Sequence, residues 1–440
     1  MTQKSRPVRI GIIGHYGNQN LGDEAITSAT IYQIRQRIPE CELIGFSLNP
    51  AATEDRHGIK TYPIRRPISK NTESADQTDD RRRVARSSGS LRQSLKRIPI
   101  VAPIMKWLRD SGLACWHGFQ EFGFLAQGYG RVRGLNLLII AGSNQIEDTF
   151  GGSFGYPFTL WKWTRLARLV GVPVVFVSVG ASPMQSALSR FFCRGALRAA
   201  KYRSLRDESS KNIVESIGVS GENLVFPDLA FSLPQKPATP KQAGETALTV
   251  AINPMPYLDS RYWPESEMVA DSYAEYVGKL ARFCRWLLGH GHRVILFPTQ
   301  LSTDGLVSRD IVAAMGAEAE KYSADRLQIR EIKGFDDLFD TIREADIVVA
   351  TRFHAVLFGH LACLPVLALS YQQKIDDLMA ASGQTPYCLS IGDFSLEQLE
   401  ETFGRISQDR GICRKRITEQ VLLNQTRLAG QFEVLTRLAH

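Results

Sequence analysis

The sequence predicts an α/β protein built from two doubly wound parallel sheets, and three observations carry this prediction. Short apolar runs of strand length alternate with segments of helical spacing along most of the chain. The alternation breaks at the polar, proline-rich stretch 232–245 and then resumes. The length of 440 residues also exceeds the roughly 250–300 at which one hydrophobic core stops growing. We therefore expect two Rossmann-like domains with a cleft where the carboxyl ends of their strands meet.

The first half of the chain, residues 1–235, is predicted to form the N-terminal domain. Strands are inferred from apolar runs rich in Val, Ile and Leu, and helices from apolar residues spaced three and four apart. The first three elements form a βαβ unit. The expected strands are 8–13, 42–47, 135–141, 172–178 and 202–205, and the expected helices are 23–37, 156–169, 184–200 and 208–217.

The second half repeats the alternation as a C-terminal domain over 246–390. Its first strand follows the proline-rich linker, and the same apolar spacing identifies the later elements. The expected strands are 247–252, 293–297, 328–332, 346–350 and 366–370, and the expected helices are 273–289, 304–315, 335–343 and one that begins at 355. The last segment, 391–440, has a helical pattern, and we expect it to cross back and brace the N-terminal domain.

A polar insertion interrupts the first domain at about 67–97. It is rich in Ser, Asp and Arg and has too few apolar residues to offset the entropy of ordering it, which predicts a mobile segment. Between residues 65 and 97, ten Lys or Arg outnumber four Asp or Glu, so this basic segment supplies most of the net charge of +8. The rest of the chain is nearly neutral, which argues against a nucleic-acid-binding protein.

An aromatic-rich stretch, 98–127, follows the insertion. Helices packed on the core are one interpretation, and an amphipathic surface segment that contacts a membrane or a partner is the other. No apolar run approaches the roughly 20 residues that span a bilayer. The N-terminus lacks the apolar core of a signal peptide, so we expect cytoplasmic residence, with peripheral contact at the inner membrane face as an added hypothesis.

Seven cysteines are scattered along the chain without a CxxC pair. An odd and dispersed set indicates neither a disulfide framework nor a zinc site. We therefore expect buried free thiols and no metal centre.

The first predicted strand ends in a glycine-containing turn, 14–25. Glycines at 14, 17 and 22 let backbone N–H groups approach a ligand, and the next helix points its positive N-terminal end toward the turn. This arrangement suits an anion or a polar sugar. In the alternative interpretation Asp23 and Glu24 only cap the helix. No GK[ST] follows, so the turn is not a Walker loop.

Polar or small residues also follow three other strands of the first domain. They are Asn144 and Asp148 after 135–141, Gly180 and Ser182 after 172–178, and Arg206 after 202–205. Arginine at the carboxyl edge of a sheet suits phosphate or carboxylate, because its planar fork makes two parallel charge-assisted hydrogen bonds. An ion pair between Arg206 and the adjacent Asp207 is the competing interpretation.

Cationic residues follow two strands of the second domain. Arg352 and His354 come after the strand 346–350, where a helix begins, and Lys374 comes after 366–370. Arginine supplies fixed positive charge, and histidine can donate a proton near neutral pH. A lone histidine is usually structural, but its place beside an arginine at a strand's carboxyl end favours a functional role.

The chain resembles the polysaccharide pyruvyl transferase family through motifs of matching order and spacing. The resemblance covers nearly the whole chain apart from the polar insertion. The motifs are Asn20-Leu-Gly-Asp-Glu24, Ser204-Leu-Arg-Asp207, Pro227-Asp-Leu-Ala-Phe231, Thr351-Arg-Phe-His-Ala355 and Tyr371-Gln-Gln-Lys374. In one departure, the family usually has three glycines before an Asp, where this chain has Ala141-Gly-Ser143 and Asp148 further on.

The resemblance implies a GT-B-like fold and an enzyme that transfers a pyruvyl group from phosphoenolpyruvate onto a sugar of a polysaccharide or its precursor, commonly as a ketal. Phosphoenolpyruvate is a co-substrate, and neither a cofactor nor a metal is expected. The implied donor-binding residues are Arg206, Arg352, Lys374, Gly180 and Ser182, and the implied acceptor contacts are Asn20, Gly22, Asn144 and Asp148. By the same resemblance His354 protonates the donor's methylene carbon, and Asp23 or Glu24 orients the acceptor or receives its proton.

The chemistry of the donor agrees with these residue types. Protonation of an enol ether develops positive charge at carbon while phosphate and carboxylate stay anionic, so fixed cations and one proton donor are needed. Two alternatives stay open. One is a nucleotide-sugar-dependent glycosyltransferase on the same fold, and the other is a non-catalytic protein of polysaccharide biosynthesis that binds a precursor or partner enzymes through 67–127. The resemblance implies a saccharide acceptor, and a lipid-linked acceptor would make the basic, aromatic insertion a docking surface for an anionic membrane.

Overall fold

The computed structural model describes residues 7–14, 20–66, 121, 123–234, 247–262 and 269–440. The predicted insertion 67–97, most of the aromatic stretch 98–127, and Gly17 lie outside the described residues. Within the described ranges, no helix is both long and apolar enough to cross a bilayer.

The N-terminal domain contains a seven-stranded sheet of order β3-β2-β1-β4-β5-β6-β7, and all of its pairings are parallel. The strands β1, β2, β4 and β5 are buried on both faces, which is why they read as continuous apolar runs. The elements are β1 (Arg9–Ile13), α1 (Leu21–Arg37), β2 (Glu42–Ser47), α2 (Pro50–His57), β3 (Lys60–Pro63), β4 (Leu137–Ala141), α4 (Tyr156–Leu169), β5 (Val174–Val179), α5 (Ala187–Ala199), β6 (Tyr202–Leu205), α6 (Glu208–Ser216), β7 (Leu224–Val225) and the 3₁₀ turn η3 (Leu229–Ser232).

The C-terminal domain contains a six-stranded parallel sheet of order β10-β9-β8-β11-β12-β13. Helices again alternate with the strands, so the predicted fold class of two doubly wound parallel sheets is confirmed. The elements are β8 (Thr249–Asn253), α7 (Val269–Gly289), β9 (Arg293–Leu296), α8 (Asp304–Met315), β10 (Leu327–Ile329), α9 (Phe335–Arg343), β11 (Ile347–Ala350), α10 (Phe353–Leu361), β12 (Val366–Ser370), α11 (Gln373–Ala381), β13 (Cys388–Ser390) and α12 (Leu396–Gln408).

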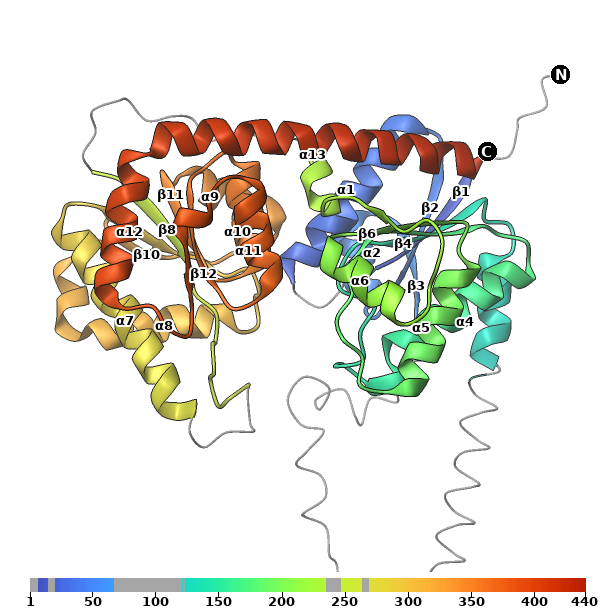
Figure 1. Ribbon diagram of the computed structural model, residues 1–440, viewed down its shortest axis with the longest axis horizontal. Helices are drawn as coiled ribbons and strands as arrows, with labels where there is room; N and C mark the ends of the chain where they lie inside the picture. The colour runs from blue at the N-terminus through green and yellow to red at the C-terminus, as the bar shows by residue number, and fades with distance from the viewer. Residues whose placement is uncertain (1–6, 15–19, 67–120, 122, 235–246, 263–268) are drawn as a thin grey trace, which may run out of the picture.

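The last helix, α13 (Arg410–Ala439), runs along both domains (Figure 1). Its 30 residues correspond to about 45 Å at the α-helical rise. In the N-terminal domain the buried Gln431 side chain donates to Ser204 Oγ at 2.6 Å and accepts from Ser178 Oγ at 3.2 Å. Glu433 pairs with Arg37 of α1 at 3.0 Å. The helix therefore links the two sheets on the face that holds the chain terminus.

The carboxyl ends of the two sheets meet at the start of α1. Leu21 N donates to Thr299 O at 3.1 Å, and Asn20 forms an isolated bridge with Gln300. Thr299 and Gln300 follow β9, so these contacts join the end of a C-terminal-domain strand to the first turn after β1. Residues that follow other strands of both sheets gather around this junction.

Candidate functional site

The centre of the junction is the imidazole of His354, which lies directly on the backbone of Gly22. A Cβ atom added at Gly22 would lie 1.9 Å from His354 Nδ1, so only glycine leaves space for the ring. The first turn of α1 is held by Asn20, whose side-chain oxygen accepts from Gly22 N at 3.0 Å. The structure thus gives Asn20 and Gly22 a positioning role against His354, in addition to the acceptor contact predicted from the sequence.

A buried carboxylate, Asp228, lies between His354 and Arg206. Its Oδ2 atom is 3.5 Å from Arg206 Nη1 and 4.0 Å from His354 Nε2. Burial raises the pKa of Asp228, and the nearby Arg206 guanidinium opposes that shift. Asp228 lies within the family motif Pro227–Phe231, but no role was predicted for it from the sequence. Its signal was an aspartate inside an otherwise apolar segment.

Two cations from different domains flank the ring of Phe353. Arg206 Cζ lies 5.0 Å and Lys374 Nζ 5.6 Å from the ring centroid. Gly180 makes room for the guanidinium, because a Cβ there would lie 2.6 Å from Arg206 Nη2. Burial and the charge of Arg206 lower the pKa of Lys374 to about 8. The positive charges are close enough to oppose one another, which makes an anion a favourable guest between them.

The same surroundings make His354 neutral in the ligand-free protein. Burial lowers its pKa well below the ordinary value, and Arg206, Lys374 and Arg352 lower it further. An anion bound beside these cations would offset their effect and raise the pKa of the imidazole. The geometry therefore couples anion binding to protonation of His354.

Arg352 differs from the free anion-binding arginine expected from the sequence. Its Nε atom donates to both oxygens of the buried Asp304, at 3.0 and 3.1 Å, and Nη2 also bonds Asp304. Asp304 accepts in addition from Thr299 N and Gln300 N, at the junction between the domains. Asp304 thus counters the charge of Arg352 at close range. Arg206 is also paired, as the competing interpretation predicted, but more loosely: it lies 3.5 Å from both Asp207 and Asp228.

The loop after β4 supplies a polar wall. Ser143 adopts a left-handed conformation with φ 54°, which costs a non-glycine residue of order 1 kcal/mol or more. Its hydroxyl donates to Asp23 Oδ1 at 2.7 Å. Asn144 Nδ2 donates to Ser182 Oγ at 2.8 Å and to Glu147 Oε2 at 3.0 Å. The serine at the position where the family usually has glycine therefore holds Asp23 in place.

Glu147 is an acidic residue of this wall that the sequence analysis did not select. Burial raises its pKa to about 7, and the Asn144 hydrogen bond and the charge of Lys374 only partly offset the shift. A carboxyl group with such a pKa is suited to proton transfer near neutral pH. The raised pKa of Glu147 follows from its burial in the structure, because nothing in the sequence distinguishes Glu147 from the adjacent Asp148.

Asp148, predicted as an acceptor contact, caps a helix in the structure. Its carboxylate oxygens accept from Ser186 N at 3.0 Å and Gln185 N at 3.3 Å, at the start of α5. Both oxygens already stabilise a helix N-terminus. We therefore leave Asp148 out of the proposed acceptor site.

The two acidic residues of the first turn of α1 face different neighbours. Asp23 faces the β4 loop, and it influences the pKa values of Glu147, Asp228 and Lys374. Glu24 is buried against α2, where it pairs with His57 at 2.6 Å and Arg56 at 3.2 Å. Glu24 also lines an interdomain cavity of about 610 Å³ that residues of α1, α2 and the 333–337 segment enclose. Asp23 is thus closer than Glu24 to the cationic site.

Among the described residues no cluster of three or more His, Cys, Asp or Glu side chains could hold a metal ion. Of the site residues predicted from the sequence, the structure brings together His354, Arg206, Lys374, Asp23, Gly22, Gly180 and the pair Asn144 and Ser182. Asp228 and Glu147 are added to this set.

Two facing Rossmann-like domains with a polar site between them define a protein of the GT-B fold class. Among solved structures the chain is similar to UDP-GlcNAc 2-epimerase from Neisseria meningitidis bound to UDP-GlcNAc, with a TM-score of 0.54 and 12% identity over 98% of this chain and 100% of that chain. It is also similar to a glycosyltransferase from Rickettsia africae, with a TM-score of 0.54 and 8% identity over 99% of both chains. Identities this low show the fold alone.

The family is shown by the sequence itself. The family model for polysaccharide pyruvyl transferase matches residues 20–373, and the chain belongs to this family of transferases. The matched range contains every member of the site except Lys374, which follows it directly. A search of curated proteins finds no match.

Proposed function

We propose that this protein transfers the pyruvyl group of phosphoenolpyruvate to hydroxyl groups of a saccharide and forms a ketal. The observation that carries the proposal is the convergence of Arg206, Lys374 and His354 around Phe353, with Asp228 between Arg206 and the imidazole. These side chains follow three different strands of two domains. Family membership supports a saccharide as the acceptor.

In the proposed donor site Arg206 and Lys374 bind the phosphate and carboxylate of phosphoenolpyruvate. Charge-assisted hydrogen bonds of this kind are about twice as strong as neutral ones. Arg352 contributes its remaining Nη1 donor and, through Asp304, fixes the edge of the site. Gly180 leaves space for the Arg206 guanidinium. Asn144 lies next to Gly180 and donates a hydrogen bond to the Ser182 hydroxyl.

The first chemical step assigned to this site is proton transfer from His354 to the donor's methylene carbon. The negative charges of the bound donor raise the pKa of His354, so donor binding favours the protonated imidazole that acts as the acid. A C–H bond forms at the methylene, and the adjacent carbon becomes an oxocarbenium-like centre. One acceptor hydroxyl adds to that carbon and releases a proton. The bond between that carbon and the phosphate oxygen then breaks, phosphate leaves with the electron pair, and an oxocarbenium-like centre forms again. A second hydroxyl adds to it and closes the ketal, and its proton goes to the leaving phosphate.

The proton of the first acceptor hydroxyl needs a base within the polar wall. Glu147, whose pKa is about 7, is matched to this task because general bases work best near the operating pH. Asp23 is held by Ser143 and is the other candidate. We assign proton acceptance to Glu147 and acceptor orientation to Asp23, and Glu24 has a supporting role through His57 and Arg56.

The direct test is incubation with phosphoenolpyruvate and a panel of free and lipid-linked saccharides. We expect phosphate release together with a product heavier by pyruvate less water, and loss of both signals in His354→Ala. The competing nucleotide-sugar glycosyltransferase is tested by thermal shift. Stabilisation by UDP and none by phosphoenolpyruvate would favour that alternative and reject the proposal.

A further inference from the structure

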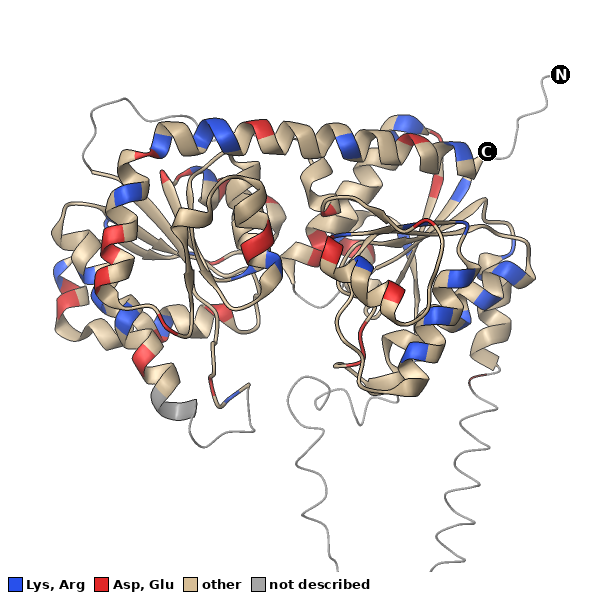
Figure 2. Ribbon diagram, in the orientation of Figure 1, with Lys and Arg blue, Asp and Glu red and all other residues tan. Residues whose placement is uncertain are grey.

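A second cationic feature lies outside the proposed site, on the helices α4 and α5 of the N-terminal domain. Neither helix contains an aspartate or glutamate. Blue bands gather on both helices in Figure 2. The two helices pack closely at Gly195, where a Cβ would lie 2.9 Å from Trp161 Cδ1. This contact brings side chains of α4 and α5 together on one outer face.

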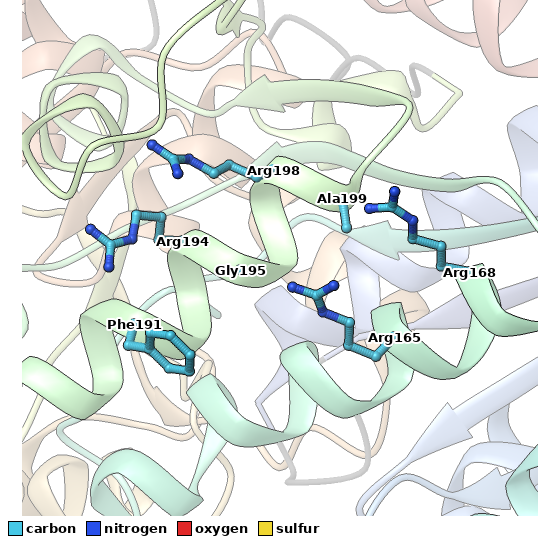
Figure 3. Close-up of a pocket in the computed structure, with 7 residues that line it drawn as sticks. All are labelled: Arg165, Arg168, Phe191, Arg194, Gly195, Arg198 and Ala199. Atoms are coloured by element: carbon cyan, nitrogen blue, oxygen red, sulfur yellow. The ribbon is translucent and has the colours of Figure 1, made fainter.

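Four arginines surround a hollow of about 250 Å³ on that face. Figure 3 shows two guanidinium groups from each helix, Arg165 and Arg168 from α4 and Arg194 and Arg198 from α5. Arg198 Nη2 donates to Gly218 O at 2.6 Å, and Arg165 stacks on Trp161 with its Cζ 5.8 Å from the ring centroid. None of the four forms an ion pair with a described residue. Unpaired like charges at this density repel one another and favour an anionic partner.

Large apolar side chains are exposed beside these arginines. Phe191 lines the hollow and is 51% exposed, Leu188 one turn earlier is 41% exposed, and Leu169 at the end of α4 is 76% exposed. The ring of Phe191 contacts that of the buried Phe192, with 5.7 Å between the ring centroids. An arginine-rich face with exposed aromatic and aliphatic side chains is the pattern of a protein surface that enters the interface of a bilayer.

We propose that the α4–α5 face, defined by the four arginines with Phe191, Leu188 and Leu169, docks on a membrane surface that contains anionic phospholipid. The arginines bind lipid phosphates, and the apolar side chains enter the region between headgroups and acyl chains. A nucleic acid would satisfy the arginines alone and would leave the exposed Phe191 and leucines without a partner, and an acidic protein is separated from a membrane by the test below. The proposal does not depend on the donor chemistry, because docking and transfer are measured separately.

The test uses the full chain and two kinds of vesicle. Flotation with vesicles of phosphatidylcholine and phosphatidylglycerol is compared with flotation on phosphatidylcholine alone. We expect binding to the anionic vesicles, weak binding to the neutral ones, and loss of binding as ionic strength rises. Absence of binding to the anionic vesicles would overturn the proposal.

Matched variants separate this face from other basic parts of the chain. In the first variant Arg165, Arg168, Arg194 and Arg198 are all changed to Gln, and we expect the partition coefficient to fall at least about tenfold. In the control variant Arg309, Lys415, Arg416 and Arg437, which are exposed on α8 and α13, are changed to Gln, and binding is expected to persist. Equal loss in the two variants, or no loss in the first, would place the contact elsewhere.

The apolar part of the surface has its own variant. Phe191→Ser keeps every charge and removes an exposed side chain, so we expect a smaller fall in vesicle binding with unchanged thermal stability. Unchanged binding of Phe191→Ser would reject insertion of the apolar side chains. Binding of the wild type to an acidic polypeptide or RNA, without binding to anionic vesicles, would assign the face to that partner instead.

Discussion

The imidazole of His354 rests on the backbone of Gly22, so that the first turn of one domain fixes a side chain of the other. A Cβ at residue 22 would lie 1.9 Å from Nδ1 and 2.1 Å from Cγ of the ring. The ring cannot keep its position when any side chain stands at residue 22. Asn20 accepts a hydrogen bond from Gly22 N and forms a bridge with Gln300 of the other domain. The contact between the domains therefore fixes Gly22, and Gly22 in turn fixes the position of His354.

We expect Gly22→Ala to reduce turnover of the proposed reaction about 100-fold, the loss that a displacement of about 1 Å can cause. Steady-state kinetics with phosphoenolpyruvate measures this change, and thermal melting shows that the fold persists. Gly430→Ala on α13 is the control, because nothing lies within 4 Å of a Cβ there. That control should keep full turnover and gain roughly 0.5–1 kcal/mol of stability. Full turnover in Gly22→Ala would contradict the placement of His354.

Donor binding should be coupled to proton uptake. Because the pKa of His354 is well below its ordinary value in the ligand-free protein, the ring is neutral at pH 7, and a bound trianionic donor raises its pKa. We expect uptake of up to about one proton per donor bound. Calorimetry in buffers of different ionisation enthalpy measures the uptake.

The uptake should depend on pH in a way that separates two groups. Lys374, with a pKa of about 8, is charged at pH 6.5 and partly neutral at pH 8. The pKa of Glu147 is also near 7, so the measurement at the lower pH uses a Glu147→Gln background. In that background the uptake comes from His354 and disappears in His354→Asn. At the higher pH a further fraction comes from Lys374 and disappears in Lys374→Arg. Proton uptake at pH 6.5 that survives in His354→Asn would exclude the coupling.

Glu147 should make stability depend on pH between its unfolded and folded pKa values. Burial raises the pKa from 4.5 to about 7, so the folded state binds the proton more tightly than the unfolded state. The favourable contribution is fully present below pH 4.5 and is lost as the pH rises through 7. The shift corresponds to about 3 kcal/mol.

The matched variant is Glu147→Gln, which keeps an oxygen that can accept from Asn144. We expect the difference in free energy of unfolding between variant and wild type to increase in favour of the variant from pH 5 to pH 8, by up to about 3 kcal/mol. Denaturant unfolding at a series of pH values gives this difference. The other titrating groups contribute equally to both proteins, so their contributions cancel in the difference. A difference that stays constant with pH would show that Glu147 titrates normally.

The sheet-forming elements were predictable because their chemistry is local. Parallel strands buried on both faces are continuous apolar runs, and helices α4, α8 and α9 begin and end at the predicted residues. Helix α2 and strand β3 were missed. Helix α2 is polar and buries only Thr53, so its caps at Asn49 and Gly58 define it rather than any apolar period.

The site was predictable in part for a related reason. Arg206, His354 and Lys374 each follow a strand, and the carboxyl ends of parallel strands meet at one edge. Pairings across long sequence separations gave no comparable signal. The Arg352–Asp304 pair joins the residue that precedes α10 to the first residue of α8, and the pKa of Glu147 depends on burial, so neither could be derived from spacing.

The Arg352–Asp304 pair yields a final prediction that separates support of the site from contact with the donor. Breaking a buried ion pair by removing one partner costs about 3–5 kcal/mol, so Arg352→Gln, which leaves the buried Asp304 unpaired, should lower the free energy of unfolding by that amount. Asp304→Asn should cost less, because the Arg352 side chain that it leaves unpaired is 24% exposed. The double variant should lose much less than the sum, because neither charge is left alone. Arg206→Gln also leaves a buried carboxylate, Asp228, without its partner, but it should in addition raise the KM for the donor about 10- to 100-fold, the loss of one charge-assisted hydrogen bond. Denaturant unfolding and donor titration measure the two effects, and additive stability losses in the double variant would show that Arg352 and Asp304 act independently.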